Sequence, residues 1–97
     1  MVRFYGGQTV TSSSDINGDF YVWRVDATSG NVTMTLPAAE DYQSQGFIVK
    51  RKDASGNTVS LEAVDLIDGA ASIALSQFDS YVVASDGSTW DVMAKNV

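Results

Sequence analysis

Residues 20–36 read FYVWRVDATSGNVTMTL, and this stretch decides the fold because the chain then repeats it. The second copy, residues 47–63, reads FIVKRKDASGNTVSLEA and keeps apolar, basic and acidic residues at one constant offset. Alternating apolar and polar residues on both sides of a Ser-Gly-Asn turn are typical of a β-hairpin. A fainter third copy, residues 79–94, reads DSYVVASDGSTWDVMA around another glycine-centred turn. We therefore expect a series of hairpins.

The first strand of the repeat is apolar on both of its faces, which a strand at the surface of a monomer should not be. In the second copy, Lys50 and Lys52 occupy one of these faces. The other face, which carries Phe20 and Val22 in the first copy, is therefore assigned to the core. The opposite face carries Tyr21, Trp23 and Val25. We expect these three side chains either in the core between two sheets or, as the alternative, at a contact between subunits.

Short strands separated by turn residues continue along the rest of the chain, and a single helical turn is expected after Pro37 ends a strand. The sequence thus predicts one all-β domain over residues 1–97, a small antiparallel sandwich or barrel, jelly-roll-like, of about eight or nine strands. Residues 1–14 are expected to form either an N-terminal arm or edge strands.

The composition excludes several classes of protein. The chain has 97 residues, 12 acids, 6 bases and a formal net charge of −6 at pH 7. It therefore lacks the basic face expected of a nucleic-acid-binding protein, and no apolar run approaches the roughly 18 residues of a membrane span. A domain of this size has a thin core, so we expect oligomerisation to add stability.

The residue types offer little chemistry. With no histidine and no cysteine, the chain lacks the commonest general base, the thiolate nucleophile and most metal-ligand sets. Asp15, Asn17 and Asp19 are spaced like the opening of a calcium-binding loop, where hard oxygens converge on one cation. Phe20 stands where such a loop needs glycine, so we favour a plain hairpin turn. We predict no metal site, no cofactor and no enzymatic activity.

A series of strand ends and turns between Leu36 and Met93 is recognisable. It consists of Thr-Leu-Pro at 35–37, Lys-Asp-Ala-Ser-Gly-Asn-Thr-Val at 52–59, Ile-Asp-Gly-Ala at 67–70 and Ser-Asp-Gly-Ser-Thr-Trp at 85–90. The series resembles β modules of tailed-bacteriophage virion proteins, including fibre ends and small capsid decoration (cement) proteins. The resemblance covers about three fifths of the chain and rests on turns and strand ends, which recur because they suit the fold.

This resemblance implies a non-enzymatic virion protein, usually a homotrimer with β-sheets packed around a three-fold axis. We expect a capsid decoration protein on the capsid exterior, bound to the major capsid protein and stabilising the shell through many weak contacts. A small domain that begins at Met1 without a long shaft favours this role over a fibre. The arm residues Val2, Arg3, Phe4 and Tyr5 are expected to face the capsid by adding to a strand edge.

The alternative is a receptor-binding tail-fibre or baseplate tip that recognises a host glycan or protein through its loops. Aromatic rings can stack on sugar faces, and the pattern leaves Trp23 and Tyr42 the freest of the rings. Trp90 follows a turn on the predicted core face, so we expect it to be buried.

Overall fold

Alternating apolar residues form strands over about half of the described chain, residues 7–18 and 21–96 of this computed structural model. The strands are β1 (Gly7–Val10), β2 (Ser14–Asp15), β3 (Val22–Val25), β4 (Val32–Thr35), β5 (Gly46–Arg51), β6 (Val59–Ile67), β7 (Ala70–Leu75), β8 (Ser80–Ser85) and β9 (Trp90–Lys95). A 3₁₀ helix, η1 (Ala39–Tyr42), follows Pro37. The predicted all-β class, strand count and helical turn are confirmed. None of the described helical segments is long and apolar enough to cross a membrane.

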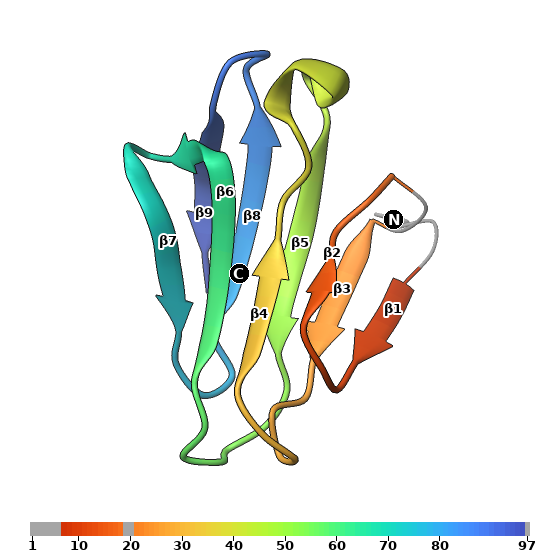
Figure 1. Cartoon of the computed structure of the whole chain (residues 1–97), viewed down its shortest axis with the longest axis vertical. Coiled ribbons are helices and arrows are strands. Elements are labelled where there is room, and N and C mark those ends of the chain that lie inside the picture. Colours follow the sequence, from red (N-terminus) through yellow and green to blue (C-terminus); the bar gives the residue numbers. More distant parts are fainter. Residues whose placement is uncertain (1–6, 19–20, 97) are drawn as a thin grey trace.

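The strands lie in two facing layers (Figure 1). One layer has the order β1-β3-β5-β8-β9, and the other consists of β2, β4 and β6 with β7 paired to β6. A single bridge between Ile67 and Trp90 joins the layers at one corner, so the strand path is continuous and nearly closed, like a barrel. The result is a plate-shaped sandwich of 34 × 33 × 21 Å.

The first six strands wind as a coil between the two layers. β1, β3 and β5 are parallel neighbours in one layer, and β2, β4 and β6 are parallel neighbours in the other. The hairpins expected at 20–36 and 47–63 are therefore wrong, because each turn arches across the sandwich instead of joining paired strands. Antiparallel hairpins are formed by β6 with β7 and by β8 with β9, and β8 also runs antiparallel to β5. The predicted antiparallel arrangement holds only for this C-terminal part.

The register between β3 and β5 sets which face of β3 is buried. Trp23 lies opposite Val49, and Val22 lies opposite Ile48. This offset is one residue shorter than the one that aligns the two sequence copies, and a shift of one residue exchanges the faces of a strand. Val22 consequently lies on the outer face, and its assignment to the core is wrong. Phe20 lies outside the described residues.

The core fills the space between the layers. Its largest fully buried side chain is Trp90, whose Nε1 donates a hydrogen bond to the carbonyl of Pro37 (3.0 Å). The Trp90 ring centre lies 5.8 Å from that of Phe47, and Tyr42 from η1 packs edge-on against Phe47 at 5.7 Å. Burial of Trp90 is as predicted. This aromatic group ties the turn after β4 to the corner where the two layers meet.

Gly46 offers a test of the pairing between β5 and β8. A Cβ at this position would lie 2.5 Å from the carbonyl oxygen of Val83, so the backbone must shift to accommodate it. We expect Gly46→Ala to lower the free energy of unfolding by about 2 kcal/mol in urea denaturation. Gly30→Ala is the matched control, because nothing lies within 4 Å of its Cβ, and it should change stability by no more than about 0.5 kcal/mol. Equal effects of the two substitutions would contradict the pairing.

Candidate functional site

An apolar row crosses the outer face of the β1-β3-β5-β8-β9 sheet. Cross-strand register places Val22, Ile48, Val82 and Ala94 in one line, with Gly7 at the β1 end. Their inward-facing neighbours in the core are Trp23, Val49 and Val83. Because successive side chains of a strand point to opposite faces, the members of the row point outward, and all four side chains are half-buried.

Two basic residues lie next to the apolar row. Arg24 on β3 is the direct cross-strand partner of Lys50 on β5. Their charged groups point apart. A guanidinium nitrogen of Arg24 lies over Gly7 on β1, only 2.8 Å from where a Cβ would stand there, while the Lys50 ammonium donates a hydrogen bond to the carbonyl of Phe78 and lies 6.0 Å from the centre of its ring.

A carboxylate lies on the other side of the apolar row. Asp91 on the edge strand β9 is paired with Ala84, which is itself opposite Gly46. The next residue of β8, Ser85, is buried, so Ala84 and Asp91 share the outer face. We call the surface formed by the apolar row, Arg24 and Lys50 the apolar-cationic face.

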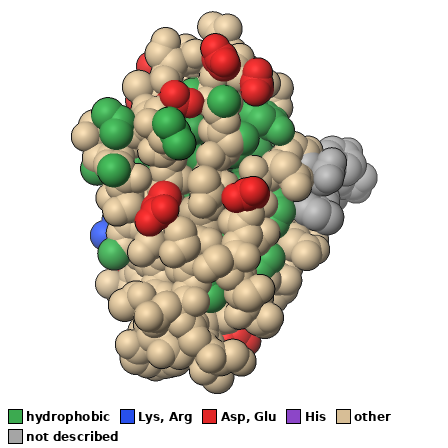
Figure 2. All heavy atoms as spheres, in the orientation of Figure 1, with side chains coloured by type: hydrophobic (Ala, Val, Ile, Leu, Met, Phe, Trp, Pro, Cys, Tyr) green, Lys and Arg blue, Asp and Glu red, His purple; other side chains and the backbone are tan. Residues whose placement is uncertain are grey.

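The outer face of the second layer carries a polar row. Asp15, Thr35, Glu62 and Ser72 follow one another across β2, β4, β6 and β7. Figure 2 shows this side of the molecule, with acidic side chains spread over it, basic side chains nearly absent and some hydrophobic side chains between them. Val64, the next outward residue of β6, is 93% exposed, so the two broad faces differ most clearly in charge.

A buried polar cluster closes one end of the sandwich. Arg51, the last residue of β5, donates from Nε and Nη2 to the carboxylate of Asp53 at 3.2 Å, and both side chains are only 4% exposed. The guanidinium also donates to the carbonyls of Leu75 (2.9 Å) and Asn57 (2.6 Å), while Asp53 accepts a bond from the amide of Ala27 (2.9 Å). The cluster thus joins the arch after β3, the arch after β5 and the end of β7.

The cluster is part of the scaffold. The Arg51 guanidinium, together with hydrogen bonds from Ser55 and Ala27, holds the pKa of Asp53 well below its usual value. A shallow depression is lined by Arg51, Ser55, Gly56, Asn57, Ser76 and Gln77. Because the guanidinium donates to acceptors within the chain, its charge is already neutralised and its hydrogen bonds are directed away from a ligand.

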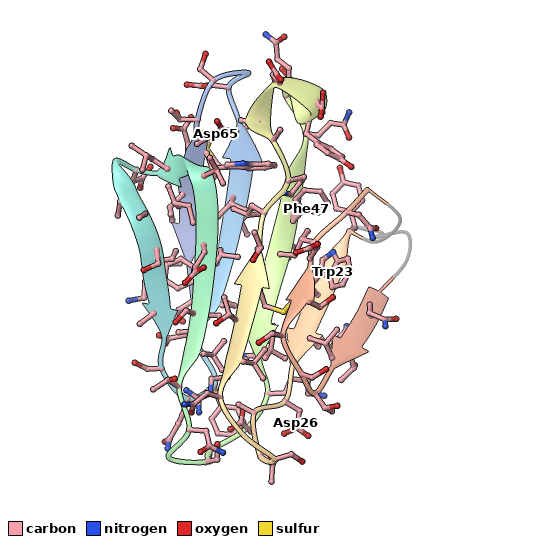
Figure 3. All side chains as sticks on the ribbon, in the orientation of Figure 1. Trp23, Asp26, Phe47 and Asp65 are labelled. Carbon is pink, nitrogen blue, oxygen red and sulfur yellow. The ribbon has the colours of Figure 1, made fainter. Side chains whose placement is uncertain are left out.

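Other carboxylates also bond the local backbone. Asp65 accepts a hydrogen bond from the amide of Ala39 at the start of η1 (2.8 Å). Asp26 accepts bonds from the hydroxyl (2.6 Å) and the amide (3.0 Å) of Thr28, which lower its pKa. Asp26 and Asp65 lie at opposite ends of the sandwich (Figure 3). These acids hold arches and turns in place, and they do not face each other across a groove.

The predicted contact set Tyr21, Trp23 and Val25 is divided between the surface and the core. Trp23 and Val25 are 3% and 0% exposed and belong to the core cluster. Their assignment to a subunit contact is wrong, because the register of β3 directs them inward. Tyr21 is 48% exposed just before β3, and its role in a contact remains a prediction.

The loop with calcium-like spacing begins as a strand. Asp15 belongs to β2 opposite Thr35, and the amide of Ile16 donates to the Thr35 carbonyl at 2.7 Å. Ile16 is buried, so it anchors the following arch, and the expected hairpin turn is wrong. Asp19 lies outside the described residues, which leaves the trio with Asn17 untested as a set. Within residues 7–18 and 21–96, no group of three or more acids could hold a metal ion.

The remaining predicted residues give no exposed aromatic platform. Tyr42 is half-buried against Phe47, and its hydroxyl accepts a hydrogen bond from the amide of Gly18 (3.1 Å). The arm residues lie outside the described residues; they are Val2, Arg3, Phe4 and Tyr5. The apolar row was not predicted from the sequence. The signal for it is the run of consecutive apolar residues at 47–49 and at 81–83, which is typical of strands with two covered faces.

The chain matches no known protein family, and no curated protein is similar to it. Its function is therefore argued from the surfaces and contacts described above.

Breaking the Arg51–Asp53 pair should be costly. Asp53→Asn leaves the guanidinium buried without its counter-charge, and we expect a loss of about 3 kcal/mol in the free energy of unfolding at pH 7. The matched control is Asp41→Asn, because Asp41 is exposed on η1, and it should change stability by less than about 0.5 kcal/mol. A loss for Asp53→Asn no larger than for the control would show that the pair does not hold the end of the sandwich.

The same carboxylate makes stability depend on pH. The pKa of Asp53 is lower in the folded chain than in the unfolded chain, so the unfolded state binds the extra proton. Its contribution is complete above the unfolded pKa of about 3.9 and is lost as the pH falls toward the folded value. We expect the free energy of unfolding to decrease between about pH 5 and pH 2.5, and to decrease less in Asp53→Asn. Equal slopes for the two proteins would exclude Asp53 as a source.

Proposed function

We propose that this chain is a non-enzymatic structural protein of a tailed-bacteriophage virion. Its specific role is that of a capsid decoration protein, which binds the major capsid protein on the outside of the head as a homotrimer and stabilises the shell. The observation that carries the proposal is the apolar row on an outer sheet face. Such a face suits a protein that acts by packing against other protein surfaces.

The positions of the resembling motifs support the proposal. The Thr-Leu-Pro stretch at 35–37 leads from β4 into η1, the segment 67–70 connects β6 to β7, and the segment 85–90 connects β8 to β9. These corners meet around Trp90, which bonds the carbonyl of Pro37 and pairs with Ile67. Three of the four motifs by which the chain resembles virion β modules thus form one connected end of the sandwich, and the fourth, residues 52–59, forms the arch after β5 at the other end.

The shape of the molecule also supports a role on a surface. A plate of 34 × 33 × 21 Å offers two broad faces and narrow edges. One broad face is polar and acidic, and the other is apolar and cationic, so the plate can lie between a protein neighbour and water. Many weak contacts of this kind hold a multivalent assembly without a deep pocket.

The buried position of Trp23 favours decoration over the tail-tip alternative. Recognition of a host glycan would use exposed rings, and of the two rings expected to be freest, Trp23 is in the core and Tyr42 is engaged by Gly18 and Phe47. The turns carry short side chains that bond their own backbone, as at Asp86, whose pKa is lowered by hydrogen bonds from Thr89 and Ser88. These residues are used to build the turns.

The test is addition of the purified protein to phage heads assembled without it. We expect the protein to bind the heads in cosedimentation, to raise the temperature at which they release DNA by several degrees, and to add density on the outer shell in electron micrographs. Protein denatured by heat before addition is the control. Binding at the tail tip with no change in head stability would overturn decoration in favour of receptor recognition.

A further inference from the structure

We infer that the apolar-cationic face is the contact surface between subunits and that its occupant is a second copy of this chain. The inference specifies the contact in the oligomer proposed above and rests on that proposal only for the existence of an oligomer. It does not depend on where in a virion the protein sits, or on whether it belongs to one.

The first argument is the difference between the two outer faces. A sheet with one face in water carries polar side chains there, as the outer face of the β2-β4-β6-β7 layer does with Thr33, Thr35 and Ser60. The corresponding outward positions of β3, β5 and β8 carry Val22, Ile48 and Val82. Val64 on β6 is an exception on the first face, but only the second face carries apolar residues in an unbroken row across three neighbouring strands.

The second argument is charge complementarity between the two ends of the face. The basic residues Arg24 and Lys50 lie on β3 and β5, and Asp91 lies on the edge strand β9 of the same sheet, beyond the apolar row. In a ring of three copies, Asp91 of one copy can meet the basic residues of the next. Such a head-to-tail contact joins two different parts of the surface and closes into a ring, as the proposed trimer requires.

The third argument is the exposed ring at the cationic end of the face. Phe78 is 54% exposed and has a φ of 60°, a left-handed conformation that is uncommon for a bulky side chain. Its carbonyl and ring hold the Lys50 ammonium. A contact that covers this ring would bury a large apolar side chain, and aromatic side chains contribute strongly to the energetics of interfaces.

The broad side of the molecule measures 34 × 33 Å, and the apolar row with its flanking charged residues occupies part of it. A contact that extends from this row over most of the broad side would be needed to bury about 800 Å² on each partner, as in an ordinary specific interface.

Sedimentation velocity of the full chain at roughly 50 μM tests the inference. We expect the wild-type chain to sediment as an oligomer, and Ile48→Thr combined with Val82→Thr to weaken association at least about tenfold. These substitutions keep β-branched side chains and should leave the circular dichroism spectrum unchanged. Val64→Thr is the matched control, because Val64 is 93% exposed on β6 outside the face, and it should sediment like the wild type.

A charge exchange gives a second readout that does not rely on apolar substitutions. Arg24→Glu and Asp91→Arg should each weaken association about tenfold, and the double variant should recover most of the loss because its charges are again complementary. A wild-type monomer would overturn both this inference and the proposed trimer. An oligomer that persists in Ile48→Thr/Val82→Thr, or charge variants without recovery, would overturn the assigned face and leave the proposed function standing.

Discussion

The structure depends on the parallel register in which β3 lies against β5. A strand has two faces, and the pairing that sets Trp23 opposite Val49 sends one set of side chains into the core and the other set outward. The core and the apolar row are therefore two consequences of the same register. If β3 moved by one residue, Trp23 would leave the core and Val22 would enter it. The packing of the core and the apolar row on the outer face would then be lost together.

The coiled path places a second demand on the chain, because an arch between layers lacks the ladder of hydrogen bonds that closes a hairpin. Side chains take over this task. At one end of the sandwich, Arg51 and Asp53 bond the backbone of two arches. At the other end, Trp90 bonds the carbonyl of Pro37, and Asp65 bonds the amide of Ala39. A buried ion pair contributes little net stability compared with an apolar substitute, but its fixed geometry suits the task of holding two loops in one arrangement.

Sequence patterns predicted the elements well and their partners poorly. The alternation around Val32 and Met34 identified a half-buried strand, and Pro37 marked where it ends, because both signals are local. Pairing of β3 with β5 depends on residues far apart in the chain. Since Val22 and Trp23 are both apolar, alternation could not choose between them, and the core and outer faces of this strand were exchanged.

Arg51 illustrates a related difficulty outside the predicted site residues. In sequence it is the middle of a Lys-Arg-Lys run that is typical of a solvated edge. The structure buries it because Asp53 lies two residues away and the arches supply carbonyl acceptors. Charge patterns identify which side chains need partners, but the partners come from the tertiary fold. The same holds for Arg24 and Lys50, whose proximity follows from strand order and not from their spacing in the sequence.

The alternation between layers also bears on the order in which the molecule forms. In a coil of parallel strands each strand pairs with the next but one along the chain. β1 therefore cannot pair until β3 is present, and β3 cannot pair with its other neighbour until β5 is present. The antiparallel pairs β6-β7 and β8-β9 join neighbours along the chain and close with little loss of loop entropy. During synthesis the N-terminal strands thus leave the ribosome before their partners exist. We expect the native register to be set from the C-terminal hairpins backward, with β5 as the template on which β3 and then β1 are added.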